Sequence, residues 1–157
     1  SELIPARNWN TADRRRSKGH FAAQIPNYIR GNGVDQAVIP EPHFLLLDIE
    51  PKPAARPRFF QGRVHTEPKY KLWQQQCTQL LRLQWDREPL QKVGHIHFVF
   101  VAANRRPDID NLMKSILDSL VYSNILRNDN LTVLDSISAS YEHTKEFKPC
   151  ILIRIYE

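Results

Sequence analysis

The stretch NRRPDIDNLMKSILDSLVYSNILRNDNLTVLD, residues 104–135, decides the fold of this chain. Within it, apolar side chains recur at intervals of three and four residues, the spacing of one face of an α-helix. These side chains are Ile109, Leu112, Met113, Ile116, Leu117, Leu120 and Val121. The pattern predicts a helix that begins just after Pro107 and packs this face into a core. A polar turn, RNDN at 127–130, then leads toward a β-rich run.

Outside this stretch, short apolar runs predict strands. FLLLDIE at 44–50 predicts a buried strand that ends before Pro51 and Pro53. HIHFVFVAA at 95–103 alternates histidines with large apolar residues, which predicts a strand with one wetter face that pairs with the first strand. Two β-rich runs, 131–143 and 150–157, close the chain.

A second helix is predicted over residues 68–85, where apolar residues recur near helical spacing and Pro68 suits a first turn. The expected fold is therefore a mixed α/β (α+β) domain, in which about four strands form a small mixed sheet with two helices. We assign this domain to residues 44–157. Residues 1–43 are predicted to be a basic N-terminal extension, and two interpretations stay open: a solvated tail, or an arm that contacts DNA or wraps a dimer partner.

Composition limits the class of function. The chain of 157 residues has the length of one domain, and 22 Lys and Arg against 17 Asp and Glu suit a polyanionic partner without requiring one. Cys77 and Cys150 have no paired spacing, which favours a reducing compartment over a zinc site or a disulfide framework. There is no apolar run near the ~20 residues of a membrane helix and no apolar centre of a secretory signal. We therefore expect a soluble cytoplasmic protein without a membrane partner.

A basic segment, PKPAARPRFFQGRVHTEPKY at 51–70, is predicted to be an exposed loop because four prolines interrupt it. Its cations are suited to phosphate contacts that position DNA without reading bases. They are Lys52, Arg56, Arg58, Arg63 and Lys69. Phe59 and Phe60 have two interpretations: a wedge that stacks at an unpaired branch point, or aromatic side chains that anchor the loop by packing.

Asp108 and Asp110 lie at the first turn of the predicted 109–121 helix, and Lys114 follows one turn later. Acids at a helix start are also explained by capping and by the helix dipole. Arg105 and Arg106 at the same place are unfavourable for that dipole, so a nearby phosphate or carboxylate cluster would explain them. Asp129, in the polar turn, would join the two acids if the last segments fold back on the helix.

Three carboxylates and a lysine are suited to phosphodiester cleavage with Mg²⁺, a cation that prefers hard oxygen ligands. The segments KPAARPRF, RPDIDNLMKSILDSL and NDNLTV resemble successive signatures of the RusA family of Holliday junction resolvases. The most specific part is the pattern D-x-D-N-x-x-K-x-x-x-D, which begins at Asp108 and ends at Asp118. The resemblance covers residues 44–157.

The resemblance implies metal ligands at Asp108, Asp110 and Asp129, an essential cation at Lys114, and a homodimer whose two sites cut opposite strands of a four-way junction. It implies Mg²⁺ as the cofactor, with Mn²⁺ as a possible substitute. One departure is that Asn128 stands where family members often carry a second acid before the final strand. Rival hypotheses are a nuclease for flaps or replication forks, a DNA-binding module without catalysis, and an interaction protein that uses the basic tail.

Four further polar residues have weaker claims to a function. Asp118 has moved about 80° around the helix from Asp110, so we interpret it as structural, either a partner of Lys114 or a dimer contact. Asn111 either caps the helix or orders a ligand. His95 and His97 share one face of their predicted strand without an accompanying acid, which favours ordinary surface or core histidines over a metal site.

Overall fold

The computed structural model describes residues 41–157, and these contain a four-stranded mixed sheet. Its strands are β1 (His43–Leu47), β6 (Cys150–Tyr156), β4 (His95–Ala102) and β5 (Ile137–His143), in that spatial order. β6 runs antiparallel to both of its neighbours, whereas β4 and β5 are parallel. The mixed α/β fold and the four strands predicted from the sequence are confirmed. The predicted direct pairing of the first strand with residues 95–103 is wrong, because β6 lies between them.

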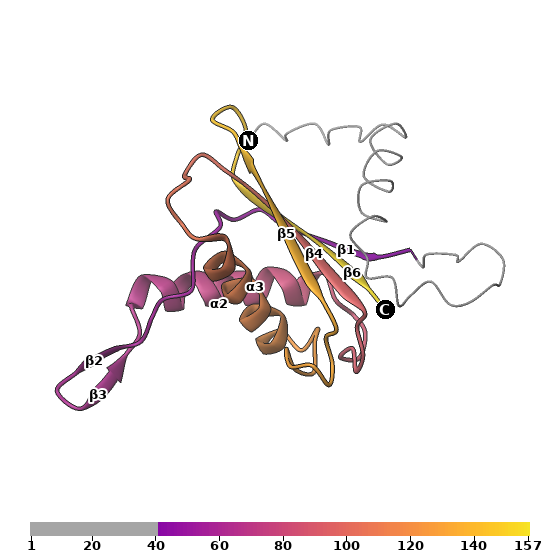
Figure 1. Cartoon of the computed structure of the whole chain (residues 1–157), viewed down its shortest axis with the longest axis horizontal. Coiled ribbons are helices and arrows are strands. Elements are labelled where there is room, and N and C mark those ends of the chain that lie inside the picture. Colours follow the sequence, from indigo (N-terminus) through magenta and orange to yellow (C-terminus); the bar gives the residue numbers. More distant parts are fainter. Residues whose placement is uncertain (1–40) are drawn as a thin grey trace. The chain divides into compact units, whose positions relative to one another are not determined.

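Two helices, α2 (Pro68–Leu83) and α3 (Ile109–Tyr122), lie on one side of this sheet (Figure 1). The buried core lies between them and the sheet, and includes Phe98 and Phe100 of β4 and Leu112, Ile116 and Leu120 of α3. Both helices agree with the predicted ranges. Ile109 departs from the predicted apolar face, because its side chain is 43 % exposed at the first turn of α3.

The opposite face of β4 carries the histidines, as the alternating pattern predicts. The imidazole nitrogens of His95 lie 2.6 Å from the Ser136 hydroxyl and 2.8 Å from the Ser138 hydroxyl. Nδ1 of His97 lies 2.6 Å from the same Ser138 hydroxyl. We call these four residues the histidine–serine cluster. Burial lowers the pKa of His95, and burial, followed by the charges of Arg154 and His95, lowers the pKa of His97 to about 4. Both rings are therefore neutral near pH 7, and the interpretation of these histidines as structural is supported.

The first strand is an edge strand, not the wholly buried strand that its apolar run predicts. Phe44 and Leu46 are 54 % and 47 % exposed, while Leu45 and Leu47 point into the core. The side chain of Gln84, just after α2, occupies the free edge. It accepts a hydrogen bond from the Leu46 backbone N–H at 3.0 Å and donates one to the Leu46 carbonyl at 2.7 Å. Gln84 thus satisfies edge groups that would otherwise be open to another strand.

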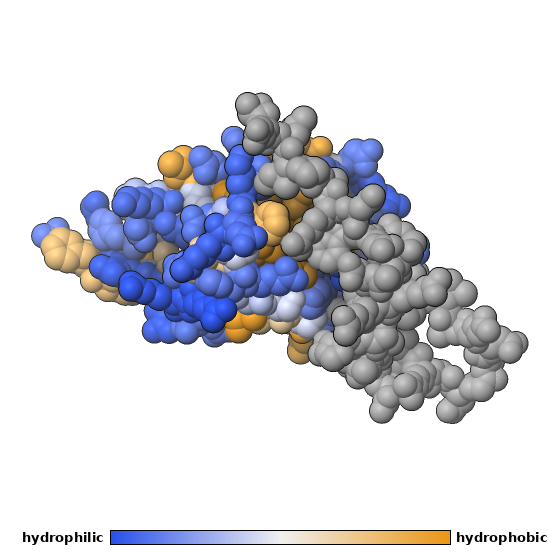
Figure 2. All heavy atoms as spheres, turned by 90° about the horizontal axis from the view of Figure 1, so that it is seen from above, coloured by the Kyte–Doolittle hydropathy of each residue, from blue (hydrophilic) through white to orange (hydrophobic). Residues whose placement is uncertain are grey.

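The basic segment is not the plain loop that its prolines predict, because it contains a hairpin of β2 (Arg58–Phe60) and β3 (Arg63–His65). Gln61 and Gly62, with φ of 50° and 72°, form its two-residue turn. Two central residues with positive φ are typical of the turn whose twist matches paired strands. The hairpin lies just before the first residue of α2 and projects away from the sheet (Figure 1). At this end of the molecule apolar and strongly hydrophilic atoms lie side by side (Figure 2).

The predicted basic extension, 1–43, lies almost wholly outside the described residues. Its basic cluster and its possible role as an arm therefore stay predictions. In the described part of the chain, neither helix has the length and apolar character that crossing a membrane demands.

Candidate active site

Asp108 and Asp110 stand at the start of α3, as the sequence predicts, and both are exposed. Asp108 is the N-cap residue, with φ −73° and ψ 137°, yet its side chain makes no capping hydrogen bond within the described residues. Asp110 accepts a 2.9 Å hydrogen bond from the Asn111 backbone N–H. Capping therefore does not account for Asp108, and its carboxylate is available to a ligand.

The loop after α3 carries Asp129 and is held by buried side chains at both ends. Ile125 and Leu126 are buried before it, and Val133 and Leu134 are buried after it. Within the loop, the Asn128 side-chain oxygen accepts hydrogen bonds from two successive backbone N–H groups, those of Asp129 at 2.8 Å and residue 130 at 3.2 Å. Asn128 therefore orders the turn, in the manner typical of Asn in turns, and leaves the Asp129 side chain to point elsewhere.

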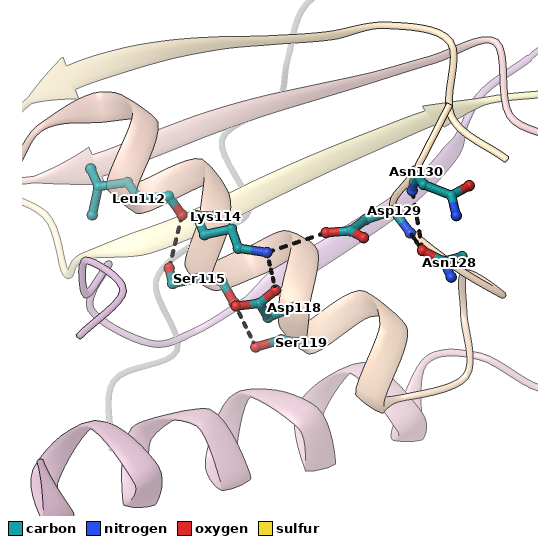
Figure 3. A network of polar contacts seen from close by, with 8 residues as sticks. All are labelled: Leu112, Lys114, Ser115, Asp118, Ser119, Asn128, Asp129 and Asn130. Atoms are coloured by element: carbon teal, nitrogen blue, oxygen red, sulfur yellow. Dashed lines mark hydrogen bonds and ion pairs between the residues drawn. The ribbon is translucent and has the colours of Figure 1, made fainter. Parts of the chain in front are cut away.

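Lys114 joins α3 to this loop (Figure 3). Its ammonium group lies 2.7 Å from Oδ1 of Asp118 and 3.3 Å from Oδ2 of Asp129. The hydrogen bond to Asp118, which outweighs partial burial, raises the pKa of Lys114, and Asp129 adds to the shift. Lys114 is therefore a permanent cation at neutral pH. The interpretation of Asp118 as a partner of Lys114 is confirmed, and the expected return of the loop toward the helix is observed at Lys114.

The gathering of Asp108, Asp110 and Asp129 around one ion stays a prediction. In residues 41–157, as the side chains stand, no group of three or more His, Cys, Asp or Glu residues is placed to hold a metal ion. The chemistry of the donors nevertheless fits Mg²⁺, because all three are carboxylates, whose hard oxygens this ion prefers. Two of them are exposed at one helix start, and the third is directed toward the same helix by Lys114.

The basic segment is attached to the candidate site through its backbone. The Ala54 N–H donates a 3.0 Å hydrogen bond to the Asn111 carbonyl in the first turn of α3. Just upstream, the Trp73 indole N–H donates a 2.7 Å bond to the Glu50 carbonyl. These two bonds fix the stretch that carries Lys52 beside the start of α3.

The other predicted DNA-contacting cations are all exposed, and they lie on separate elements. Arg56 precedes the hairpin, Arg58 and Arg63 are on it, and Lys69 is in the first turn of α2. Arg105 and Arg106 lie between β4 and α3. The predicted wedge residues Phe59 and Phe60 are 78 % and 65 % exposed on the hairpin, so neither anchors the segment by packing.

Two residues without a predicted role support this site. The Tyr141 hydroxyl contacts the carbonyls of Ala102 and Asn104, at 3.0 and 2.5 Å, and thereby holds the start of the segment that carries the two arginines. Tyr70 of α2 is 5 % exposed, and its hydroxyl has no hydrogen-bond partner among the described residues. The Tyr141 contacts join distant segments, and the burial of Tyr70 depends on tertiary packing, so the local sequence carries no signal for either.

Comparison with known protein families identifies a match for this chain. The family model described as Endodeoxyribonuclease RusA matches residues 48–156, which is more than half of the chain. A search of the curated proteins finds no match.

Proposed function

The chain belongs to the RusA family of Holliday junction resolving endodeoxyribonucleases, and we propose that Asp108, Asp110 and Asp129 hold the metal ions with which it cuts four-way DNA junctions. The observation that carries this proposal is the 3.3 Å contact between Lys114 and Asp129. It joins the lysine of the family-like motif to an acid 15 residues further along the chain. The contact supports a single site that contains both the motif and the loop acid.

The proposed metal is Mg²⁺, with Mn²⁺ as a substitute, because carboxylate oxygens suit both ions. When bound, such an ion supplies Lewis acidity at the scissile phosphate and makes water a stronger nucleophile. The exposed carboxylates of Asp108 and Asp110 provide the first donors, since one helix start fixes both. Asp129 provides the third donor from the loop.

Lys114 has a separate task in the proposed reaction. Its raised pKa keeps it positively charged, so it can donate a hydrogen bond to a nonbridging oxygen of the scissile phosphate. The nonbridging oxygens gain negative charge as water attacks the phosphorus, and a fixed ammonium group stabilises this charge. Lys114 is 55 % exposed, which leaves it accessible to a DNA backbone.

Seven cations, of which Lys52 is half-buried and the others are exposed, form the proposed DNA-binding surface, whose phosphate contacts position the junction. They are Lys52, Arg56, Arg58, Arg63, Lys69, Arg105 and Arg106. In the hairpin, the cross-strand pairs are Arg58 with His65, Phe59 with Val64, and Phe60 with Arg63. Phe59 thus lies on an apolar face, and Phe60 lies among cations. We assign the two phenylalanines to stacking at the branch point, where unpaired bases expose their faces.

Paired cuts on opposite strands need two active sites, so we propose that the enzyme acts as a homodimer. A two-fold dimer matches the symmetry of a four-way junction, since each protomer would meet an equivalent strand. We also propose that the enzyme acts in the cytoplasm of a bacterial or phage-infected cell.

The test is cleavage of a synthetic four-way junction in Mg²⁺ by the wild type, Asp110→Asn and the control Asp86→Asn, an exposed acid outside the site. We expect paired symmetric nicks from the wild type and the control. Asp110→Asn should be slower by at least about a hundredfold, the scale on which loss of one preorganised charged group slows catalysis. Equal rates in all three proteins, or no cleavage by the wild type, would contradict the proposal.

A further inference from the structure

We infer that Asp118 is a positioning residue, which keeps the Lys114 ammonium group at the active site when Asp129 turns to a metal ion. The inference rests on the proposed function, because it assumes that Asp129 is a metal ligand. It assigns to Asp118 a task that differs from metal binding, although Asp118 is an acid of the same motif.

The two acids that hold Lys114 differ in how they are attached. Asp118 lies on α3 itself, four residues after Lys114, and this spacing places the two side chains on the same helix surface. Asp129 reaches Lys114 from a loop. The contact with Asp118 is also the shorter, at 2.7 Å against 3.3 Å. Lys114 can therefore lose Asp129 and still be held.

Metal binding would take the Asp129 carboxylate away from Lys114. An Asp129 carboxylate that coordinates a divalent ion shares its charge with that ion, and the ion repels the nearby ammonium group. Without a second partner, the flexible lysine would turn to solvent, where it cannot reach the scissile phosphate. Asp118 offers the compensating negative charge from the side chain's own helix. This explains why the site contains a fourth acid that is displaced around the helix from Asp110.

The negative charge of Asp118 also acts on a buried tyrosine of the neighbouring helix, Tyr70 of α2. Burial, and then the negative charge of Asp118, raise the pKa of the Tyr70 hydroxyl to about 12, so the phenol stays protonated. Its hydroxyl is buried and lacks a hydrogen-bond partner among residues 41–157. The charge of Asp118 therefore acts on Tyr70 of α2 as well as on Lys114.

The test measures Lys114 directly, without catalysis. Trace acetylation by an amine-reactive reagent, followed by mass spectrometry, gives the relative reactivity of each lysine, and Ca²⁺ serves as the metal probe. The variant is Asp118→Asn, which keeps the shape and removes the charge. The matched control is Asp135→Asn, because Asp135 also contacts a lysine, Lys92, at 2.7 Å, and is exposed to a similar degree, 29 % against 28 %.

With Ca²⁺ present, we expect Lys114 of Asp118→Asn to react about two to five times faster than in the wild type, the range that exposed ion pairs reach. Lys92 should be unchanged in that variant. In Asp135→Asn the result should be the reverse, with Lys92 faster and Lys114 unchanged. On junction DNA in Mg²⁺, Asp118→Asn should lower kcat with little change in KM, and Asp118→Glu should restore part of kcat.

Three outcomes would overturn the inference. If Ca²⁺ binds to the wild type, as calorimetry measures, but Lys114 reacts equally in wild type and Asp118→Asn, the positioning role is wrong and the metal site stands. If Asp118→Asn loses Ca²⁺ binding altogether, Asp118 is a ligand instead. If the wild type binds no divalent ion and Mg²⁺ fails to support cleavage, the proposed function fails and this inference fails with it.

Discussion

Acidification should destabilise this protein through His97, and His97→Gln should remove that part of the effect. The folded state holds the pKa of His97 at about 4, whereas the ordinary value is 6.5. Between these two pH values, His97 is therefore protonated in the unfolded chain but neutral in the folded protein. The stabilisation is complete above the ordinary value and is lost as pH falls through it toward the folded value. The groups that face the ring include Ser138 and Ser140 of β5, Arg154 of β6 and His95 of its own strand.

The size of the effect follows from the two pKa values. Between about pH 7.5 and about pH 5, linkage gives a loss of about 2 kcal/mol in the free energy of unfolding from His97 alone. Urea unfolding at both pH values measures this loss. Because the carboxylates titrate in both proteins, the difference between the losses of wild type and His97→Gln isolates the contribution of His97. His143→Gln, at the exposed end of β5, is the control and should follow the wild type. If His97→Gln loses stability in parallel with the wild type, the argument from burial is refuted.

Three further perturbations follow from the edge strand and the hairpin. Gln84→Ala should lower the free energy of unfolding, measured in urea, by about 1–2 kcal/mol. The exposed edge at Leu46 should also make the variant form concentration-dependent oligomers on size-exclusion chromatography. A monodisperse, equally stable variant would exclude the edge role. Arg58→Ala should reduce the slope of log K against log salt for junction binding in Ca²⁺ by about one, the value of one phosphate contact. An unchanged slope would argue against that contact. Phe59→Ala should weaken binding to a four-way junction more than binding to a linear duplex, by roughly 1–3 kcal/mol if one base stacks on it, whereas equal losses on both would place Phe59 away from the branch point.

Elements with a local signal were predictable from the sequence. α2 and α3 follow from apolar residues at helical spacing, and β4 from its alternation, because neighbouring residues determine these patterns. The hairpin was missed, since its prolines and its exposure hide the alternation of a strand, although Gln61-Gly62 is a plausible two-residue turn. The partner of β1 was predicted wrongly because strand pairing depends on segments far apart in the chain, and periodicity says nothing about them.

The contacts in the candidate site also divide into local ones, which the sequence can suggest, and nonlocal ones, which it cannot. The pairing of Lys114 with Asp118 lies within one helix, so spacing alone could suggest it. The approach of Asp129 required the loop to return to α3, which the sequence could suggest but not demonstrate. The effect of the Asp118 charge on the pKa of Tyr70 depends on the packing of two helices that are separated by a strand in the sequence, and no local pattern indicates it. Nonlocal contacts therefore account for most of what the structure adds.

The hydrogen bond between the Ala54 N–H and the Asn111 carbonyl links the proposed DNA-binding segment to α3, which carries the proposed metal ligand Asp110, through main-chain atoms. Any residue except proline supplies the donor at position 54, and every residue supplies the acceptor at position 111. Substitutions can therefore change which DNA the segment prefers without releasing it from the helix that carries Asp110. In evolutionary terms, the DNA specificity of this protein can change while the distance between the DNA-binding segment and the site of cleavage stays the same.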